Sequence, residues 1–268
     1  MEVTTYFGMD YNPFSKDIAS SLLYESNDFK QMVNRGEFVI TTRGIGVFLS
    51  NSGMGKTVCL RKMLESLNPS RYKVIYICMT TITPADFYRM LNDELGLDET
   101  PRKSQMFAQI QNELKRLVKE SKMEIVIAID EVQFLKKDVL REFIMLMNFD
   151  YDSKDYCTLL LVGQNEFIKP LRLKSLEPLK QRINMNYIFT GFDENEVREY
   201  VISRLKIVHC RTDVFTNESY HTLYTLMNTS VRILNQLINK SLILAMSRQK
   251  STIDSELIME ASKELMVV

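Results

Sequence analysis

The chain has 268 residues, of which 45% are hydrophobic, so the sequence predicts a globular protein with one sizeable core and a smaller second domain. Its 34 basic and 34 acidic residues balance, which removes any global electrostatic argument for binding nucleic acid. The four cysteines are widely separated and form no C-x-x-C pair, so their spacing indicates neither a zinc site nor a disulfide framework.

Neither a targeting signal nor a membrane segment is predicted. The first residues lack the basic start and apolar core of a signal peptide. No apolar run approaches the roughly 18 residues that a membrane helix needs. We therefore expect a cytoplasmic protein without a membrane partner.

The first part of the chain predicts strands that alternate with helices. Residues 1–36 are expected to form a lead-in segment, because a proline after Asn12 interrupts early regular structure. The expected strands cover residues 38–42, 45–49, 72–79, 124–129, 156–162 and 185–190, and the expected helices cover 58–67, 84–95, 104–118, 138–148 and 166–173. This alternation predicts an α/β domain over residues 37–191, with a mainly parallel sheet and right-handed crossovers.

The last part of the chain predicts helices alone. Apolar residues at helical spacing recur in segments that contain Val197, Tyr220, Leu234 and Leu257. Only residues 251–253 have strand character between them. The sequence thus predicts a small all-helical domain over residues 192–268.

A glycine-bearing loop that ends in Lys56-Thr57 lies between an apolar run and a helical segment. Strand, glycine loop and helix are the context of a phosphate-binding loop (P-loop), whose inward N–H groups and helix N-terminus attract phosphate oxygens. We expect Lys56 to reach the β- and γ-phosphates of ATP and the Thr57 hydroxyl to hold Mg²⁺. The pattern G-x-x-x-x-G-K-[ST] is met except at its first glycine, where this chain has Ser50. The expected nucleotide-binding residues of the loop are Ser52, Gly53, Met54, Gly55, Lys56, Thr57 and Val58.

A second motif comes further along the chain, where the apolar run of residues 124–129 ends in Asp130 and Glu131. A run that is apolar at nearly every position predicts a strand buried on both faces of a parallel sheet. Ligands of such sheets lie at the carboxyl ends of the strands. We expect Asp130 to hold Mg²⁺, directly or through water, and Glu131 to orient and polarise the attacking water.

An α/β P-loop domain followed by a small helical lid resembles an AAA+ ATPase, and the resemblance implies roles for further residues. Gln164, after Leu-Val-Gly, takes the place of the polar sensor-1 residue that contacts the attacking water or γ-phosphate. Arg182, within Gln-Arg-Ile, takes the place of the arginine finger that reaches a neighbouring subunit's γ-phosphate. Arg232, within Val-Arg-Ile-Leu-Asn, takes the place of sensor 2, which contacts nucleotide from its own lid.

More narrowly, the order of motifs is similar to that of the ExeA-like group, which is related to the TnsC- and MuB-type ATPases encoded beside transposases. These motifs are Tyr-Phe-Gly, Asn-Pro-Phe, the P-loop, Ile-Asp-Glu-Val-Gln, Leu-Val-Gly-Gln, Gln-Arg-Ile and Val-Arg-Ile-Leu-Asn. The resemblance covers essentially the whole chain. The chain departs from the pattern at Ser50 and at residues 228–230, which lack the glycine usual before the sensor-2 arginine.

The resemblance implies a regulator of transposition that assembles on double-stranded DNA with ATP, recruits or stimulates a transposase, and disassembles on hydrolysis. A site completed by Arg182 of the next copy couples hydrolysis to assembly, and such head-to-tail contacts close into a ring or continue as a helical filament. Thr83, Arg102 and Lys103 occupy positions that resemble DNA-contacting regions of TnsC-type relatives. Ordinary solvated loops are the alternative for these residues.

Two other functions remain open from the sequence. One is an ExeA-like ATPase that serves assembly of a secretion machine, although the membrane helix and cell-wall-binding domain typical of such proteins are not expected in this sequence. The other is a nucleotide-gated binding module with little catalysis, for which Ser50 is the only support.

Overall fold

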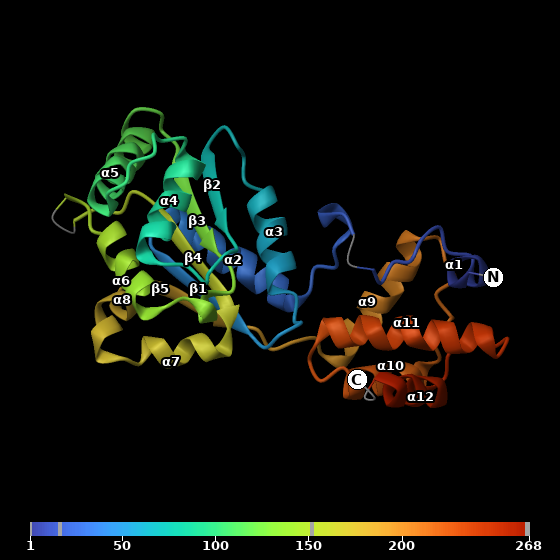
Figure 1. Cartoon of the computed structure of the whole chain (residues 1–268). Coiled ribbons are helices and arrows are strands. Elements are labelled where there is room, and N and C mark those ends of the chain that lie inside the picture. The colour runs from blue at the N-terminus through green and yellow to red at the C-terminus, as the bar shows by residue number, and fades with distance from the viewer. Residues whose placement is uncertain (1, 16–17, 151–152, 266–268) are drawn as a thin grey trace. The chain divides into compact units, whose positions relative to one another are not determined.

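The buried apolar runs form a parallel sheet, in a computed structural model that describes residues 2–15, 18–150 and 153–265 (Figure 1). The sheet has five strands in the order β2-β3-β4-β1-β5, and each neighbouring pair is parallel. The strands are β1 (Ile45–Ser50), β2 (Tyr72–Ile77), β3 (Glu124–Ile129), β4 (Thr158–Gln164) and β5 (Ile183–Ile188). The predicted parallel α/β sheet is therefore confirmed.

Helices connect and cover these strands, as right-handed crossovers between parallel strands require. Several of these helices and the sheet share one core, in which Phe87, Phe143 and Ile127 are completely buried. The helices are α2 (Asn27–Thr42), α3 (Lys56–Glu65), α4 (Pro84–Leu95), α5 (Lys103–Lys119), α6 (Lys137–Leu146), α7 (Ile168–Leu171) and α8 (Glu177–Gln181). Short 3₁₀ turns η2 (Val132–Phe134), η4 (Asn165–Phe167) and η5 (Lys174–Leu176) lie in the connections.

The strand predicted over residues 38–42 is wrong, because these residues form the end of helix α2. A short apolar run cannot by itself distinguish a strand from a buried helical turn. The correct period becomes visible only over a longer window, since Met32, Val39 and Ile40 are buried at helical spacing. Phe38, which suggested a strand, is 49% exposed.

The chain divides into two compact units, and the sheet belongs to the second, which comprises Gln31–Asn51 and Lys56–Phe189. The first unit comprises Met1–Lys30, Ser52–Gly55 and Thr190–Val268. Its helices are α1 (Val3–Phe7), the 3₁₀ turn η1 (Ser20–Leu22), α9 (Glu194–Ile207), α10 (Asn217–Leu226), α11 (Val231–Ser247) and α12 (Ser255–Leu265). The predicted C-terminal helices are thus present.

Residues near the N-terminus contribute to the core of the first unit. Phe7 and Phe14 are buried there among residues of the C-terminal helices. Asn12 donates a side-chain hydrogen bond to Asn239 at 2.9 Å, and Asn239 donates to the Phe14 carbonyl at 3.3 Å. The Asn-Pro-Phe motif is therefore held against helix α11. Among the described residues, no helix is both long enough and apolar enough to cross a membrane.

Candidate nucleotide-binding site

The P-loop runs from the end of β1 to the start of α3, and the backbone explains which of its residues must be glycine. Gly53 and Gly55 have φ values of 80° and 94°, in the left-handed region that favours glycine. Ser50 instead continues strand β1 in register with Gln164 of β4. Because Ser50 has strand geometry, the first position of the pattern does not need glycine in this chain.

Lys56 is buried at the first position of α3, and its side chain folds back onto the loop. Its Nζ donates to the Ser50 Oγ at 2.8 Å, to the Asn51 carbonyl at 3.1 Å and to the Ser50 carbonyl at 3.4 Å. These oxygens compensate for burial of the positive charge. They also hold the ammonium inside the loop, where a phosphate would be bound.

Thr57, in the first turn of α3, and Asp130, directly after β3, meet through their side chains. The Thr57 hydroxyl donates to Asp130 Oδ2 at 2.7 Å, and the Glu131 N–H donates to Asp130 Oδ1 at 2.8 Å. A hydroxyl and a buried carboxylate are hard oxygen ligands, which is the donor type that suits Mg²⁺ beside nucleotide phosphates. The residues present therefore fit this ion.

Tyr76 is a neighbour of the acidic motif that the sequence did not single out. Its hydroxyl donates to Asp130 Oδ2 at 3.2 Å from the adjacent strand β2. Burial, together with the charge and hydrogen bond of Asp130, raises the pKa of the Tyr76 hydroxyl well above its usual value. The phenol therefore stays protonated at neutral pH and orients the Asp130 carboxylate.

Glu131 lies directly after β3 in a left-handed conformation, with φ 55°. Backbone strain of this kind is concentrated at functional sites. Gln133 Nε2 donates to the carboxylate of Glu131 at 2.5 Å, and Thr80 Oγ1 donates to the Glu131 carbonyl at 3.1 Å. The sequence reasoning assigned no role to Gln133 or Thr80, although the Gln follows the acidic pair within the same motif.

The end of β4 approaches the P-loop through two consecutive residues. Gln164 pairs with Ser50, and its backbone N–H donates to Gln133 Oε1 at 2.9 Å. Asn165 Nδ2 donates to Asn51 Oδ1 at 2.8 Å, a contact that the sequence reasoning missed. The only available signal for Asn165 was a polar residue directly after the buried strand. The structure therefore places Gln164 beside Ser50 at the start of the P-loop, and its contact with the water or γ-phosphate stays a prediction.

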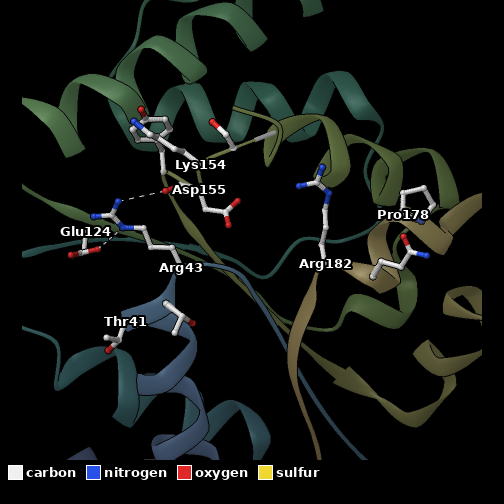
Figure 2. A pocket seen from close by; sticks show the side chains of 11 residues that line it. Thr41, Arg43, Glu124, Lys154, Asp155, Pro178 and Arg182 are labelled. Atoms are coloured by element: carbon white, nitrogen blue, oxygen red, sulfur yellow. Dashed lines mark hydrogen bonds and ion pairs between the residues drawn. The ribbon is translucent and has the colours of Figure 1, made fainter. Parts of the chain in front are cut away.

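Arg182 lies at the opposite end of the sheet from the P-loop. It follows α8 and precedes β5, so it belongs to the edge where the strands begin, whereas Lys56 follows the carboxyl end of β1. A cavity of about 740 Å³ opens at this edge, lined in part by Arg43, Glu124 and Arg182. Figure 2 shows Arg43 and Glu124 on one side of it and Arg182 on the other. Arg43 Nε donates to Glu124 at 3.0 Å.

Arg232 is brought to the P-loop by its backbone, within the first unit. Its N–H donates to the Gly53 carbonyl at 3.1 Å, near the start of α11. A Cβ on Gly53 would collide with the Ser230 hydroxyl and lie 3.1 Å from the Arg232 Cβ. Gly53 is thus required both for its φ and for this close approach. The Arg232 side chain is exposed.

The three candidate DNA contacts have different surroundings. The Thr83 hydroxyl accepts from Asp86 N at 3.3 Å as part of the capping box of α4. Lys103 forms an ion pair with Glu142 at 2.7 Å. Arg102 is exposed at the start of α5. Two of the three polar groups are therefore already engaged within the protein, and DNA contact by all three stays a prediction.

Comparison with known proteins finds similarity over the part of the chain that carries the P-loop and the acidic motif. Residues 40–171 match the family model described as "AAA domain". The chain is 29% identical over 248 residues to General secretion pathway protein A of Aeromonas hydrophila. This match covers 91% of the chain and 45% of that protein, so the chain spans less than half the length of this curated relative.

Solved structures show the same fold at low sequence identity. Cdc6p from Pyrobaculum aerophilum has a TM-score of 0.68 at 16% identity, with 94% of this chain and 70% of that chain covered. Drosophila ORC bound to DNA has a TM-score of 0.69 at 14% identity, covering 99% and 66%. The Thermotoga maritima RuvB Holliday junction branch migration motor has a TM-score of 0.56 at 13% identity, covering 94% and 73%. The predicted P-loop fold of the AAA+ type is confirmed, and the matched AAA domain is consistent with the predicted ATPase type.

Proposed function

We propose that this chain, which carries an AAA domain over residues 40–171, hydrolyses ATP to ADP and phosphate as an assembly of copies on double-stranded DNA. Lys56 and the loop N–H groups of residues 52–58 bind the phosphates, and Thr57 and Asp130 hold Mg²⁺. The ion supplies charge neutralisation for the phosphates when bound. Glu131 accepts a proton from the attacking water, and Gln164 hydrogen-bonds that water or the γ-phosphate. Arg232 contacts the nucleotide from the lid.

The observation that carries the proposal is the separation of Arg182 from the protein's own P-loop. The strand β5 that follows Arg182 has six residues, which corresponds to about 20 Å at about 3.3 Å per residue. No side chain spans that distance, so Arg182 does not reach its own nucleotide, and we assign it to the nucleotide of another copy. An arginine supplied in this way stabilises charge in the transition state.

A head-to-tail contact of this kind makes ATP part of the interface between copies. Such heterologous contacts form a ring when their rotation closes and a helical filament when it does not. Nucleotide that binds the assembled form better than the free copies shifts the equilibrium towards assembly. Hydrolysis removes the γ-phosphate that Arg182 contacts and so weakens the contact.

The experiment that tests this site mixes two inactive variants. Lys56→Ala removes the P-loop cation but keeps Arg182, and Arg182→Ala keeps an intact P-loop. Each variant alone is expected to lose about 10³-fold or more in turnover. An equimolar mixture is expected to regain measurable hydrolysis, because Arg182 of one variant completes the P-loop of the other. A mixture that stays inactive, while Arg182→Ala binds ATP and both variants co-assemble, contradicts the shared site.

The cellular role that we propose is regulation of transposition in the cytoplasm, with a transposase as the recruited partner. The order of motifs supports this role, as does the fold shared with ORC and Cdc6 proteins, one of them solved bound to DNA. Among residues 2–15, 18–150 and 153–265, Thr83 and Lys103 have partners within the protein, whereas the exposed Arg102 side chain has none and is the best candidate for contact with DNA. Phosphate contacts of this type bind DNA without regard to sequence.

A second candidate role is assembly of a secretion machine, and it is favoured by the similarity to General secretion pathway protein A over 91% of the chain. Fluorescence anisotropy with labelled duplex DNA at low salt, with and without a non-hydrolysable ATP analogue, separates the two roles. DNA binding that depends on the analogue supports the transposition role. Assembly with the analogue but no affinity for DNA favours the secretion role.

A further inference from the structure

We propose that Gln133 is the residue that positions Glu131, and that it couples the Glu131 carboxylate to the end of β4. This inference rests on the proposed catalytic role of Glu131. The side-chain amide of Gln133 makes one hydrogen bond as a donor and one as an acceptor. Its Nε2 donates to Glu131 Oε2 at 2.5 Å, and its Oε1 accepts from the Gln164 backbone N–H at 2.9 Å.

The two partners fix the orientation of the Gln133 amide. A backbone N–H can only donate, so the atom that faces Gln164 must be the oxygen. The nitrogen then faces Glu131, whose ionised carboxylate can only accept. The amide is therefore matched to both partners at once, and neither a carboxylate nor an aliphatic side chain at position 133 could make both bonds.

Local backbone geometry brings the amide to this place. Glu131 adopts φ 55°, which turns the chain sharply at the end of β3 into the 3₁₀ turn η2. Val132 is completely buried, so the turn is anchored to the core on one side of Gln133. The side chain of Gln133 then spans from the end of β3 to the end of β4. The sheet places these two strands side by side.

The adjacent residue of β4 is shaped to accept this turn. A Cβ on Gly163 would lie 2.6 Å from Gln133 Oε1, 2.7 Å from Val132 Cγ2 and 3.0 Å from Val132 N. The last of these atoms is backbone, and Val132 is completely buried, so a Cβ at this position would require the turn itself to shift. Gly163 does not have a positive φ, so its role is close approach rather than conformational freedom. Gly163 and Gln133 thus belong to one arrangement.

In this arrangement the two carboxylate oxygens of Glu131 have different roles. Oε2 is bound by Gln133, and Oε1, which no side chain in the described part of the chain binds, is the acceptor that remains to take a proton from water. The backbone that bonds Gln133 belongs to Gln164, the residue proposed to contact the water or the γ-phosphate. A displacement of Gln164 is therefore transmitted through one side chain to the carboxylate that acts on the same water.

The test separates binding of nucleotide from turnover. In Gln133→Ala, the dissociation constant of a fluorescent ATP analogue is expected to stay within about twofold, while kcat falls about 10- to 100-fold because the carboxylate is misplaced. Gln133→Glu keeps the size of the side chain but replaces the amide donor that faces Glu131 with a second carboxylate. Its kcat is expected to fall at least as far as that of Gln133→Ala. Phe134→Ala, on the same turn with a side chain 56% exposed, is the matched control and should keep wild-type kcat.

A double-mutant cycle distinguishes positioning from a merely structural role. Single-turnover hydrolysis is measured for Glu131→Gln, Gln133→Ala and the double variant. If Gln133 acts through Glu131, the double variant is no slower than Glu131→Gln alone. An additional loss in the double variant, or a wild-type kcat in Gln133→Ala, overturns the inference. Unchanged hydrolysis in Glu131→Gln would instead overturn the proposed catalytic role itself, so the two failures are distinguishable.

Discussion

The hydroxyl of Ser50 lies 2.8 Å from the ammonium of Lys56, so the residue that departs from the P-loop pattern is itself a partner of the loop's lysine. Ser50 is completely buried and in strand geometry. The same hydroxyl also donates to the Asn51 carbonyl at 2.7 Å. The departure is therefore not a defect of the turn but an additional polar group beside the phosphate-binding cation.

Replacing Ser50 tests what this hydroxyl does. A phosphate oxygen that binds Lys56 competes with the Ser50 hydroxyl, so Ser50→Ala is expected to raise ATP affinity by about three- to tenfold, the range of one modest hydrogen bond. Without nucleotide, the same variant should be less stable by about 1 kcal/mol, because a buried cation loses a partner. Titration calorimetry and thermal unfolding measure the two effects.

Ser50→Gly is the matched comparison for that variant. It removes the same hydroxyl and restores the usual residue, and it adds a loss of stability of about 0.5–1 kcal/mol from backbone freedom in a strand. Both variants should move ATP affinity in the same direction. Weaker binding by both would show that the hydroxyl assists nucleotide binding rather than competing with it.

Thr57→Val should weaken the binding of Mg²⁺ at the nucleotide site. Valine keeps the branched shape but removes the hydroxyl that lies 2.7 Å from Asp130 Oδ2. We expect the Mg²⁺ concentration needed for half-maximal hydrolysis to rise at least about tenfold, as happens when one ligand-bearing group is lost. Thr57→Ser retains the hydroxyl and should stay close to wild type. Equal Mg²⁺ dependence in Thr57→Val and Thr57→Ser would remove Thr57 from the ion site.

Asp254 makes the stability of helix α12 dependent on pH. Its Oδ1 accepts from the Leu257 N–H at 2.9 Å, and this bond, followed by the pair with Lys250, holds the pKa of Asp254 below its usual range. A lowered folded-state pKa contributes stability that is complete above the unfolded value of about 3.9 and is lost as pH falls below it through the folded value.

Asp254→Ala should therefore cost about 1 kcal/mol at neutral pH, the usual value of a helix N-cap, and less in acid. Urea unfolding at neutral pH and at several points below about pH 4 measures this difference. Asp254→Asn keeps a capping oxygen without a titrating charge, and its stability should vary less with pH than that of the wild type. A constant difference between wild type and Asp254→Ala at all pH values would contradict the assignment.

Charge reversal at Arg102 is the informative test of DNA contact, and reversal at Lys103 is not. Lys103→Glu would set a second carboxylate against Glu142, which Tyr88 also contacts at 2.9 Å, and so would disturb packing between helices. Arg102→Glu should weaken binding of duplex DNA in the presence of an ATP analogue and lower the salt dependence by about one phosphate contact. Lys263→Glu on α12 is the control for net charge, and nucleotide affinity should not change in either variant.

The local motifs of the site could be predicted from the sequence because each is formed by residues that are close together in the chain. Lys56, Thr57 and Asp130 each follow a buried apolar run, and parallel strands bring such ends together. The capping of α4 by Thr83 was equally readable, since Pro84 follows at the first helical position. The strand prediction for residues 38–42 was wrong because the helical period of α2 cannot be recognised in so short a window.

The supporting contacts could not be predicted, because each joins residues far apart in the chain. Tyr76 and Asp130 are 54 residues apart, and Gln133 is 31 residues from Gln164. Their pairing depends on which strands are neighbours and in what register, which a single sequence does not specify. The packing of Phe14 with the C-terminal helices was hidden in the same way.

The placement of Arg182 at one edge of the sheet and the P-loop at the other gives any open stack of copies two unlike ends. In the proposed assembly, a loaded P-loop at one end faces solvent and keeps its triphosphate, and Arg182 at the other end has no nucleotide to act on. Copies are then gained and lost at different rates at the two ends, so a linear assembly grows in one direction along the DNA. A closed ring has no ends, and all its sites are equivalent.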